Sequence, residues 1–134
     1  MKSSKAPKPI GSYPHSRRVG NILFLSGVGP RKQGSNVIPG VVVDGQGNIV
    51  AHDIEEQCHA VFQNVKIILD EAGSNWNNLI DITVYLTDMK GDFDRYNQIY
   101  ADYFKNNQPC RTTVEVKSLP TPIAIELKCI AIID

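Results

Sequence analysis

The sequence PCRTTVEVKSLPTPIAIE, residues 109–126, contains two runs rich in β-branched residues on either side of a proline-rich connection. Alternating side-chain character predicts strands over residues 112–116 and 123–133. The connection Leu119-Pro120-Thr121-Pro122 cannot be helical, because proline lacks an amide hydrogen and restricts the residue before it. We therefore expect two strands of a β-sheet in this part of the chain.

The predicted strand over residues 123–133 has two different faces. Successive side chains of a strand point to opposite sides, so Glu126 and Lys128 share one face. The other face is fully apolar and consists of Ile123, Ile125, Leu127, Cys129, Ala131 and Ile133. The carboxylate of Glu126 either meets solvent, pairs with a cation such as Arg111, or works in a site.

Length and composition predict one soluble domain. The 134 residues are enough for one hydrophobic core but not for two, so we expect a single domain over residues 1–134. The chain is 42% hydrophobic and 21% charged, which is ordinary for a globular protein. Residues 1–43 contain seven Lys and Arg but no Asp or Glu, a pattern typical of a surface that attracts anions. A pI of about 6.8 argues against a dedicated nucleic-acid-binding protein.

The sequence also bears on location. Residues 1–10 are rich in proline and lysine and are predicted to form an extended or mobile arm. No apolar segment approaches the ~18 residues of a membrane helix, and no apolar run follows the basic N-terminus. Three cysteines without metal-type spacing are typical of reduced thiols. We expect a cytoplasmic protein.

The remaining pattern predicts an α+β fold. Hairpins are expected over residues 17–26 and 41–50, a long amphipathic helix over 53–72, a strand over 79–86 and a second helix over 92–104. In the strand over 79–86, Ile80, Ile82, Val84 and Leu86 are expected on one face. Two helices can cover only one face of the sheet. The other face is too mixed for a core and too apolar for a solvated surface, so we expect other subunits to cover it.

Few residues have a pattern that points to chemistry. The chain has no phosphate-binding glycine loop and no nucleophile elbow, and its three histidines lack metal-ligand spacing. Cys110 is either a thiol activated by its neighbour Arg111 or a packed small residue. Arg111 either binds a carboxylate with two parallel hydrogen bonds or forms an internal salt bridge to Glu126 or Glu115.

Several motifs occur in the same order as in one known family. They are Gly11-x-Tyr13, the run 20–27 (GNILFLSG), Asn64-Val65, Val84-x-Leu86-x-Asp88-Met89, Phe93, Asn97-x-x-Tyr100, the run 111–116 (RTTVEV), Leu119-Pro120, Ile125-Glu126 and Ala131. On these motifs the chain resembles the YjgF/RidA family of enamine/imine deaminases over nearly its whole length.

The resemblance implies a chorismate-mutase-like α+β domain, with a mixed sheet, two helices on one face, and trimers around a central barrel. It places the sites in clefts between subunits, without a metal or cofactor. In the family, the residues that match Arg111, Glu126 and Tyr13 bind the substrate carboxylate, hold the attacking water and line the pocket. We add Gly27, Arg18 and Thr113 as candidate substrate-binding residues.

Some positions depart from the usual family pattern. The segment Gly11-Ser12-Tyr13-Pro14-His15 and the pair Arg17-Arg18 are similar to the 2-aminomuconate deaminase branch. Arg18 either provides a second cation for a dicarboxylate or lies on a solvated hairpin turn.

We expect a hydrolytic deaminase that converts carboxylate-bearing imines or enamines to the oxo acid and ammonia. One alternative is a non-catalytic trimer that binds small carboxylates or acts as a chaperone. Another is an endoribonuclease or translation inhibitor, which only the basic first 43 residues favour.

Overall fold

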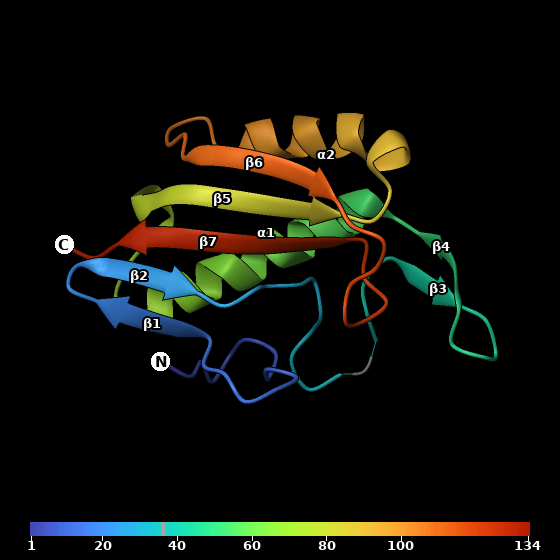
Figure 1. Ribbon diagram of the computed structural model, residues 1–134, viewed down its shortest axis with the longest axis horizontal. Coiled ribbons are helices and arrows are strands. Elements are labelled where there is room, and N and C mark those ends of the chain that lie inside the picture. The colour runs from blue at the N-terminus through green and yellow to red at the C-terminus, as the bar shows by residue number, and fades with distance from the viewer. Residues whose placement is uncertain (36) are drawn as a thin grey trace.

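The computed structural model describes residues 1–35 and 37–134. A five-stranded mixed sheet in the order β1-β2-β7-β5-β6 forms its centre (Figure 1). The strands are β1 (Ser16–Val19), β2 (Ile22–Leu25), β5 (Leu79–Leu86), β6 (Cys110–Glu115) and β7 (Ile125–Ile132). β5 and β6 are parallel, and the other neighbouring strands are antiparallel. The strands predicted over 112–116 and 123–133 therefore lie on either side of β5.

Both helices, α1 (Ile54–Glu71) and α2 (Met89–Tyr103), pack on the same face of the sheet (Figure 1). The ends of α1 agree with the prediction, since the Asp53 carboxylate accepts the amide hydrogens of Glu55 and Glu56. α2 begins at Met89, earlier than predicted, because the side chain of Asp88 caps it by accepting the Gly91 amide hydrogen at 3.0 Å.

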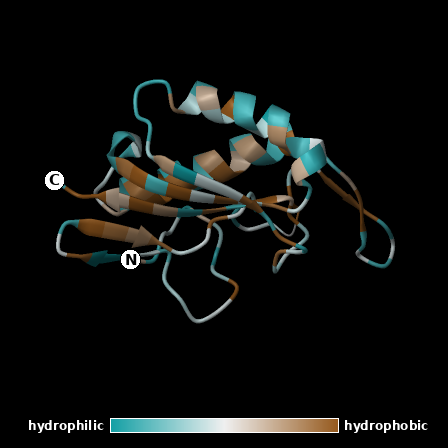
Figure 2. Ribbon diagram, turned by 45° about the horizontal axis from the view of Figure 1, so that its top comes forward, coloured by the Kyte–Doolittle hydropathy of each residue, from teal (hydrophilic) through white to brown (hydrophobic). Residues whose placement is uncertain are grey.

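The hydrophobic core lies between the sheet and the two helices. β7 alternates between buried and half-buried residues along its whole length, as its sequence predicted. Along both helices, hydrophobic and hydrophilic residues alternate, as Figure 2 shows by colour. Large side chains that are fully buried include Leu23, Leu25, Val61, Phe62, Leu69, Leu79, Ile82, Leu86, Tyr96, Ile125 and Leu127.

The prediction for Ile80 was wrong. Its side chain is 42% exposed, whereas Leu79 is 1% exposed. The pairing of β5 with β7 shifts register between Leu79 and Asp81, and the irregularity places Leu79 in the core instead of Ile80. From Ile82 onward, the alternation of β5 follows the prediction.

The face of the sheet away from the helices, called the open face below, carries both apolar and ionisable side chains. Glu126 on β7 pairs with Tyr85 on β5, which in turn pairs with Val114 on β6. Farther along, Phe24 on β2 is 38% exposed and pairs with the half-buried Ile130. The open face therefore resembles an interface more than an ordinary solvated surface.

A second, two-stranded sheet lies beside the main one. It consists of β3 (Val41–Val43) and β4 (Ile49–His52), close to the predicted hairpin. The Asp44 carboxylate accepts the amide hydrogens of Gln46 and Asn48 at 2.9 Å, which fixes the turn and holds the pKa of Asp44 below its usual value. A short 3₁₀ helix, η1 (Trp76–Asn78), leads from α1 to β5.

The first ten residues, expected as an extended or mobile arm, lie against α1 in the structure. The Glu71 carboxylate accepts hydrogen bonds from the hydroxyl groups of Ser3 and Ser4 and from the amides of Ser4 and Lys5. Ala6 is 1% exposed. The arm therefore lies beside the end of α1, because its hydroxyl and amide groups donate hydrogen bonds to the Glu71 carboxylate.

Candidate functional site

Glu126 lies half-buried on the open face, against the backbone of Gly27. A Cβ atom at Gly27 would come within 2.9 Å of Glu126 Oε2 and 3.1 Å of its carboxyl carbon. Only glycine leaves room for the carboxylate at this distance. Burial raises the pKa of Glu126 above its ordinary value of 4.5, and the positive charge of Arg31 opposes that rise.

The local chain path brings Gly27 to this place. After β2, Val28 pairs with Leu127 of β7 through two backbone hydrogen bonds, Val28 N–H to Leu127 O at 2.8 Å and the reverse at 2.9 Å. Between the Phe24–Ile130 pair and the Val28–Leu127 pair, the β2 side has one residue more than β7. An extra residue of this kind bends a strand and changes the direction of its side chains, and it is frequent beside functional sites.

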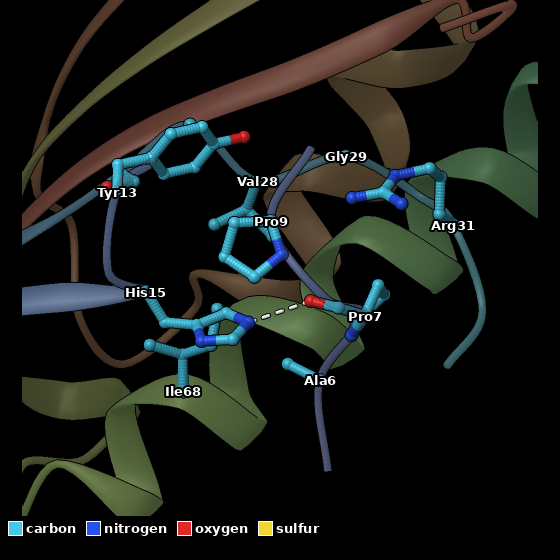
Figure 3. A pocket seen from close by; sticks show the side chains of 11 residues that line it. Ala6, Pro7, Pro9, Tyr13, His15, Val28, Gly29, Arg31 and Ile68 are labelled. Carbon is cyan, nitrogen blue, oxygen red and sulfur yellow. Dashed lines mark hydrogen bonds between the residues drawn. The ribbon is translucent and has the colours of Figure 1, made fainter. Parts of the chain in front are cut away.

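A small cavity, shown in Figure 3, has Gly27 in its lining. Its polar lining residues are Tyr13, His15, Ser26 and Arg31, and the arm supplies Ala6, Pro7 and Pro9. Its volume of about 30 Å³ holds a water molecule but not a whole amino-acid-sized ligand. The hydroxyl of Tyr13 accepts the Ile10 amide hydrogen at 3.3 Å.

His15 supports the cavity wall with both ring nitrogens. Nδ1 accepts the Ser3 amide hydrogen at 2.8 Å, so Nε2 carries the proton and donates to Pro7 O at 2.7 Å. The side chain is buried, and Figure 3 shows it directed at Pro7. Both nitrogens are therefore occupied by the arm, and His15 has no free nitrogen for chemistry.

Arg111 lies elsewhere, at the start of the edge strand β6. Its guanidinium carbon stands 4.7 Å from the ring centre of Tyr100 and 5.5 Å from that of Tyr96. Nη1 donates to Asn97 Oδ1 at 2.8 Å. Two aromatic rings and one hydrogen bond thus fix the plane of the guanidinium, and most of its five N–H groups stay available for a ligand.

The internal salt-bridge alternative for Arg111 was wrong for a single chain. Among the described residues, no ion pair joins Arg111 to Glu126 or Glu115. Glu115 instead accepts the Met89 amide hydrogen at 2.9 Å, at the start of α2.

Arg111 and Glu126 point to opposite faces of the sheet. Arg111 pairs with Ile82, whose side chain is buried under the helices, and paired residues in a sheet share a face. Glu126 pairs with Tyr85 on the open face. Within one chain, Arg111 and Glu126 therefore lie on opposite faces of the sheet, although the sequence analysis expected them in one site.

The other candidate residues divide between these two places. Tyr13 and Gly27 lie at the Glu126 side, whereas Thr113 lies at the Arg111 side, where its hydroxyl is 2.9 Å from that of Tyr96. Arg18 belongs to neither. Its Nε donates to Gly20 O at 2.6 Å, so the side chain folds onto its own hairpin turn, and the structure favours the solvated-turn alternative.

The thiols and possible metal ligands have simple environments. Cys58 and Cys129 are buried, and burial raises the pKa of each thiol to about 12, which makes them poor nucleophiles. Cys110 is exposed. Within residues 1–35 and 37–134, no three His, Cys, Asp or Glu side chains gather in a way that would hold a metal ion. The described helices include none with the length and apolar character needed to cross a bilayer.

Comparison with known proteins decides the family. The sequence profile described as Endoribonuclease L-PSP matches residues 3–133. A RutC family protein of Pyrococcus abyssi is 41% identical over 130 residues, which cover 96% of this chain and 92% of that protein. The chain belongs to the YjgF/RidA family. Reactive Intermediate Deaminase A of Arabidopsis thaliana, a chloroplastic protein, is 34% identical over 131 residues, which cover 98% of this chain and 64% of that relative.

Solved structures of YjgF/RidA members have the same fold. The Escherichia coli YjgF gene product superposes with a TM-score of 0.82 at 29% identity, covering 98% of this chain and 95% of that one. The structure of E. coli TdcF with bound serine gives a TM-score of 0.83 at 28% identity, covering 100% and 98%. The α+β fold with two helices on one face of a mixed sheet is thus confirmed.

Sequence reasoning missed two residues beside the cavity. Arg31 was counted only as one basic residue among seven, and Asn64 was noted only as part of a motif. Asn64 is buried on α1, and its amide group donates to Gly29 O at 2.9 Å and to Arg31 O at 2.7 Å. A polar residue on the apolar face of a predicted helix was the available signal for Asn64.

Proposed function

We propose that this protein is a hydrolytic deaminase for carboxylate-bearing imines and enamines, and that each site contains Arg111 of one copy and Glu126 of another. Support comes from family membership and from the position of each group. Arg111 lies on an edge strand, with its guanidinium fixed by aromatic rings. Glu126 lies on the face of the sheet opposite α1 and α2. A homotrimer in which the β6 edge of one copy lies against the open face of the next would bring Arg111 of the first copy and Glu126 of the second into one cleft.

The observation that carries the proposal is the environment of Glu126. A half-buried carboxylate with a raised pKa is a stronger base than a free one, and the positive charge of Arg31 opposes part of the rise. Gly27, which also lines the cavity, lies directly against the carboxylate. These properties suit a base that takes a proton from water.

The reaction needs one base and one cation. Arg111 holds the substrate carboxylate, which orients the adjacent imine carbon. The water oxygen bonds to that carbon as Glu126 accepts a proton from the water, and the C=N electron pair moves to nitrogen. Glu126 then returns the proton to nitrogen. The proton of the remaining hydroxyl then passes to the nitrogen through Glu126 as the C–N bond breaks, so that ammonia leaves and the oxo acid remains.

A nuclease role has less support. The family description includes the word endoribonuclease. In this chain, however, His15 is tied to the arm, His52 pairs with Asp92 at 2.7 Å, and His59 contacts the Tyr103 hydroxyl at 2.7 Å. Three histidines engaged in separate places do not make a paired acid and base for RNA cleavage.

Ammonia release tests the proposed function. Imines are generated freshly from amino acids, and wild type is compared with Glu126→Gln, Arg111→Ala and the control Arg95→Ala. Arg95 forms an exposed ion pair with Glu55, which contributes little to stability. We expect wild type and Arg95→Ala to release ammonia equally and the other two to be strongly impaired. Absence of ammonia with wild type, alongside normal binding of carboxylates, would favour the non-catalytic binding trimer.

A further inference from the structure

Arg31 is a cation beside Glu126 that the proposed reaction does not use. Its guanidinium points into the cavity, where Tyr13 and Pro9 also project (Figure 3). Its charge reaches Glu126, because it lowers the pKa of that carboxylate against the effect of burial. Arg31 is thus another candidate for the second cation that the sequence analysis considered at Arg18.

The position of Arg31 is built into the fold. The buried amide of Asn64 binds the backbone oxygens on both sides of Pro30, those of Gly29 and Arg31, at 2.9 and 2.7 Å. The guanidinium itself uses Nη2 for one hydrogen bond, to Lys8 O at 2.8 Å. A guanidinium has five N–H donors, so donors remain for a ligand once the side chain is held in place.

The surroundings favour an anion. Within the part of the chain that the structure describes, no acidic residue lines the cavity, and no Asp or Glu occurs in residues 1–43, which supply ten of its eleven lining residues. The eleventh is the apolar Ile68 of α1. His15 already satisfies both of its nitrogens within the protein and does not compete for the ligand.

The size of the cavity limits what enters it. With a volume of about 30 Å³, it takes one end of a ligand only. Gly27 lines the cavity and also contacts the Glu126 carboxylate, so a ligand end near Arg31 lies close to the proposed reaction centre. A substrate that occupies both places therefore carries its reacting carbon beside Glu126 and an anionic group at its far end.

We propose that Arg31 is a specificity-determining residue that binds a second carboxylate, so that the preferred substrates are dicarboxylic imines or enamines. The inference rests on the proposed function, in which Arg111 of another copy binds the first carboxylate. A charge-assisted hydrogen bond to Arg31 forms with a dicarboxylate and is absent with a monocarboxylate. Arg31 is thus a determinant of substrate choice rather than a participant in bond breaking.

Binding of unreactive acids tests Arg31 separately from catalysis. Adipate and hexanoate have the same number of carbons and differ by one carboxylate. Calorimetric titration with both acids is made on wild type, Arg31→Gln, Arg31→Lys and the control Arg95→Gln, after light scattering and circular dichroism have shown equal assembly and folding. We expect Arg31→Gln to weaken adipate binding about 10- to 100-fold and hexanoate binding less than about 3-fold. The affinity of Arg31→Lys for adipate should lie between those of wild type and Arg31→Gln, and the affinity of Arg95→Gln should equal that of wild type. Equal affinity of wild type for the two acids, or equal losses in Arg31→Gln, would overturn the proposal.

Turnover provides the second readout. Values of kcat/KM are measured for a dicarboxylic enamine, 2-aminomuconate, and for 2-iminobutanoate. We expect Arg31→Gln to lower the ratio of the two values at least about 10-fold, mainly through KM for the dicarboxylate. If Arg31 acted only by tuning Glu126, both substrates would lose equally and the pH profile would shift, which would refute the role in specificity. Wild type that binds adipate through Arg31 but releases no ammonia would refute the proposed function and leave the binding role standing.

Discussion

Replacing Glu126 with glutamine tests the proposed base most directly within one chain. Glutamine keeps the size of the side chain and its fit against Gly27, where an added Cβ would already be only 2.9 Å from the carboxylate oxygen. It cannot accept the proton of the attacking water. Both nitrogens of His15 are engaged, and among the described residues no acidic side chain lines the neighbouring cavity, so we expect no group there to replace the base.

The expected loss of kcat in Glu126→Gln is large because no substitute base is expected beside it. A positioned base contributes typically 10²- to 10⁴-fold to rate, and we expect a loss of kcat of at least about 100-fold, or about 2.7 kcal/mol of barrier. The assay is ammonia release under saturating imine, with substrate affinity measured in parallel. A variant that keeps more than about a third of wild-type kcat would refute the assignment of Glu126 as the base.

The same variant has a signature in stability. Burial raises the pKa of Glu126, so the folded protein resists ionisation of this group more than the unfolded chain does. The free energy of unfolding of wild type therefore falls relative to that of Glu126→Gln as the pH rises. The fall begins near the ordinary Glu pKa of 4.5 and is complete above the raised pKa of Glu126 in the folded protein. Thermal unfolding between pH 4 and pH 8 should show this widening difference in Tm. A constant difference across the range would show that burial does not perturb Glu126.

The remaining predictions concern the clamp, the glycine and the assembly. Arg111→Lys keeps the charge but loses the planar fork that stacks on Tyr100, so kcat/KM should fall at least about 10-fold with the fold and assembly unchanged, and near-normal kcat/KM would make Arg111 structural. Gly27→Ala should displace the Glu126 carboxylate and lower kcat about 100-fold with little change in Tm, because the tip of a flexible side chain can move aside; Gly45→Ala, which meets open space, is the control. Light scattering at micromolar concentration under reducing conditions should give a stable trimer, and a monomer would remove the basis for a shared site.

The fold was predictable because its sequence signals are strong and local. Asp53 and Gly73 mark the ends of α1, and the eight residues of β7 alternate without interruption. The mixed character of the open face was also visible, since it depends only on the alternation of strands. Ile80 was misplaced because a register irregularity depends on the pairing partner, which a single strand's pattern does not contain.

The candidate site was visible in part. Family resemblance makes Arg111, Glu126 and Tyr13 candidates, but the pattern did not reveal that Arg111 and Glu126 face opposite sides of the sheet. That relation arises from the pairing register, which puts Arg111 beside Ile82 and Glu126 beside Tyr85 of β5. Arg31 remained hidden because its position depends on two hydrogen bonds from Asn64 on a distant helix. Contacts between segments far apart in sequence leave little local signal.

The central claim is that Arg111 and Glu126 of different copies form one site. This claim is tested by measuring ammonia release from mixed trimers of two inactive variants, Arg111→Ala and Glu126→Gln. The variants are combined in equal amounts, either by coexpression or by unfolding and refolding them together. In random mixed trimers, a site between copies receives an intact Arg111 and an intact Glu126 in about one case in four, so the mixture should recover about a quarter of wild-type ammonia release. If both residues of one chain formed the site, every site would contain a defect and the mixture would stay as inactive as each variant alone.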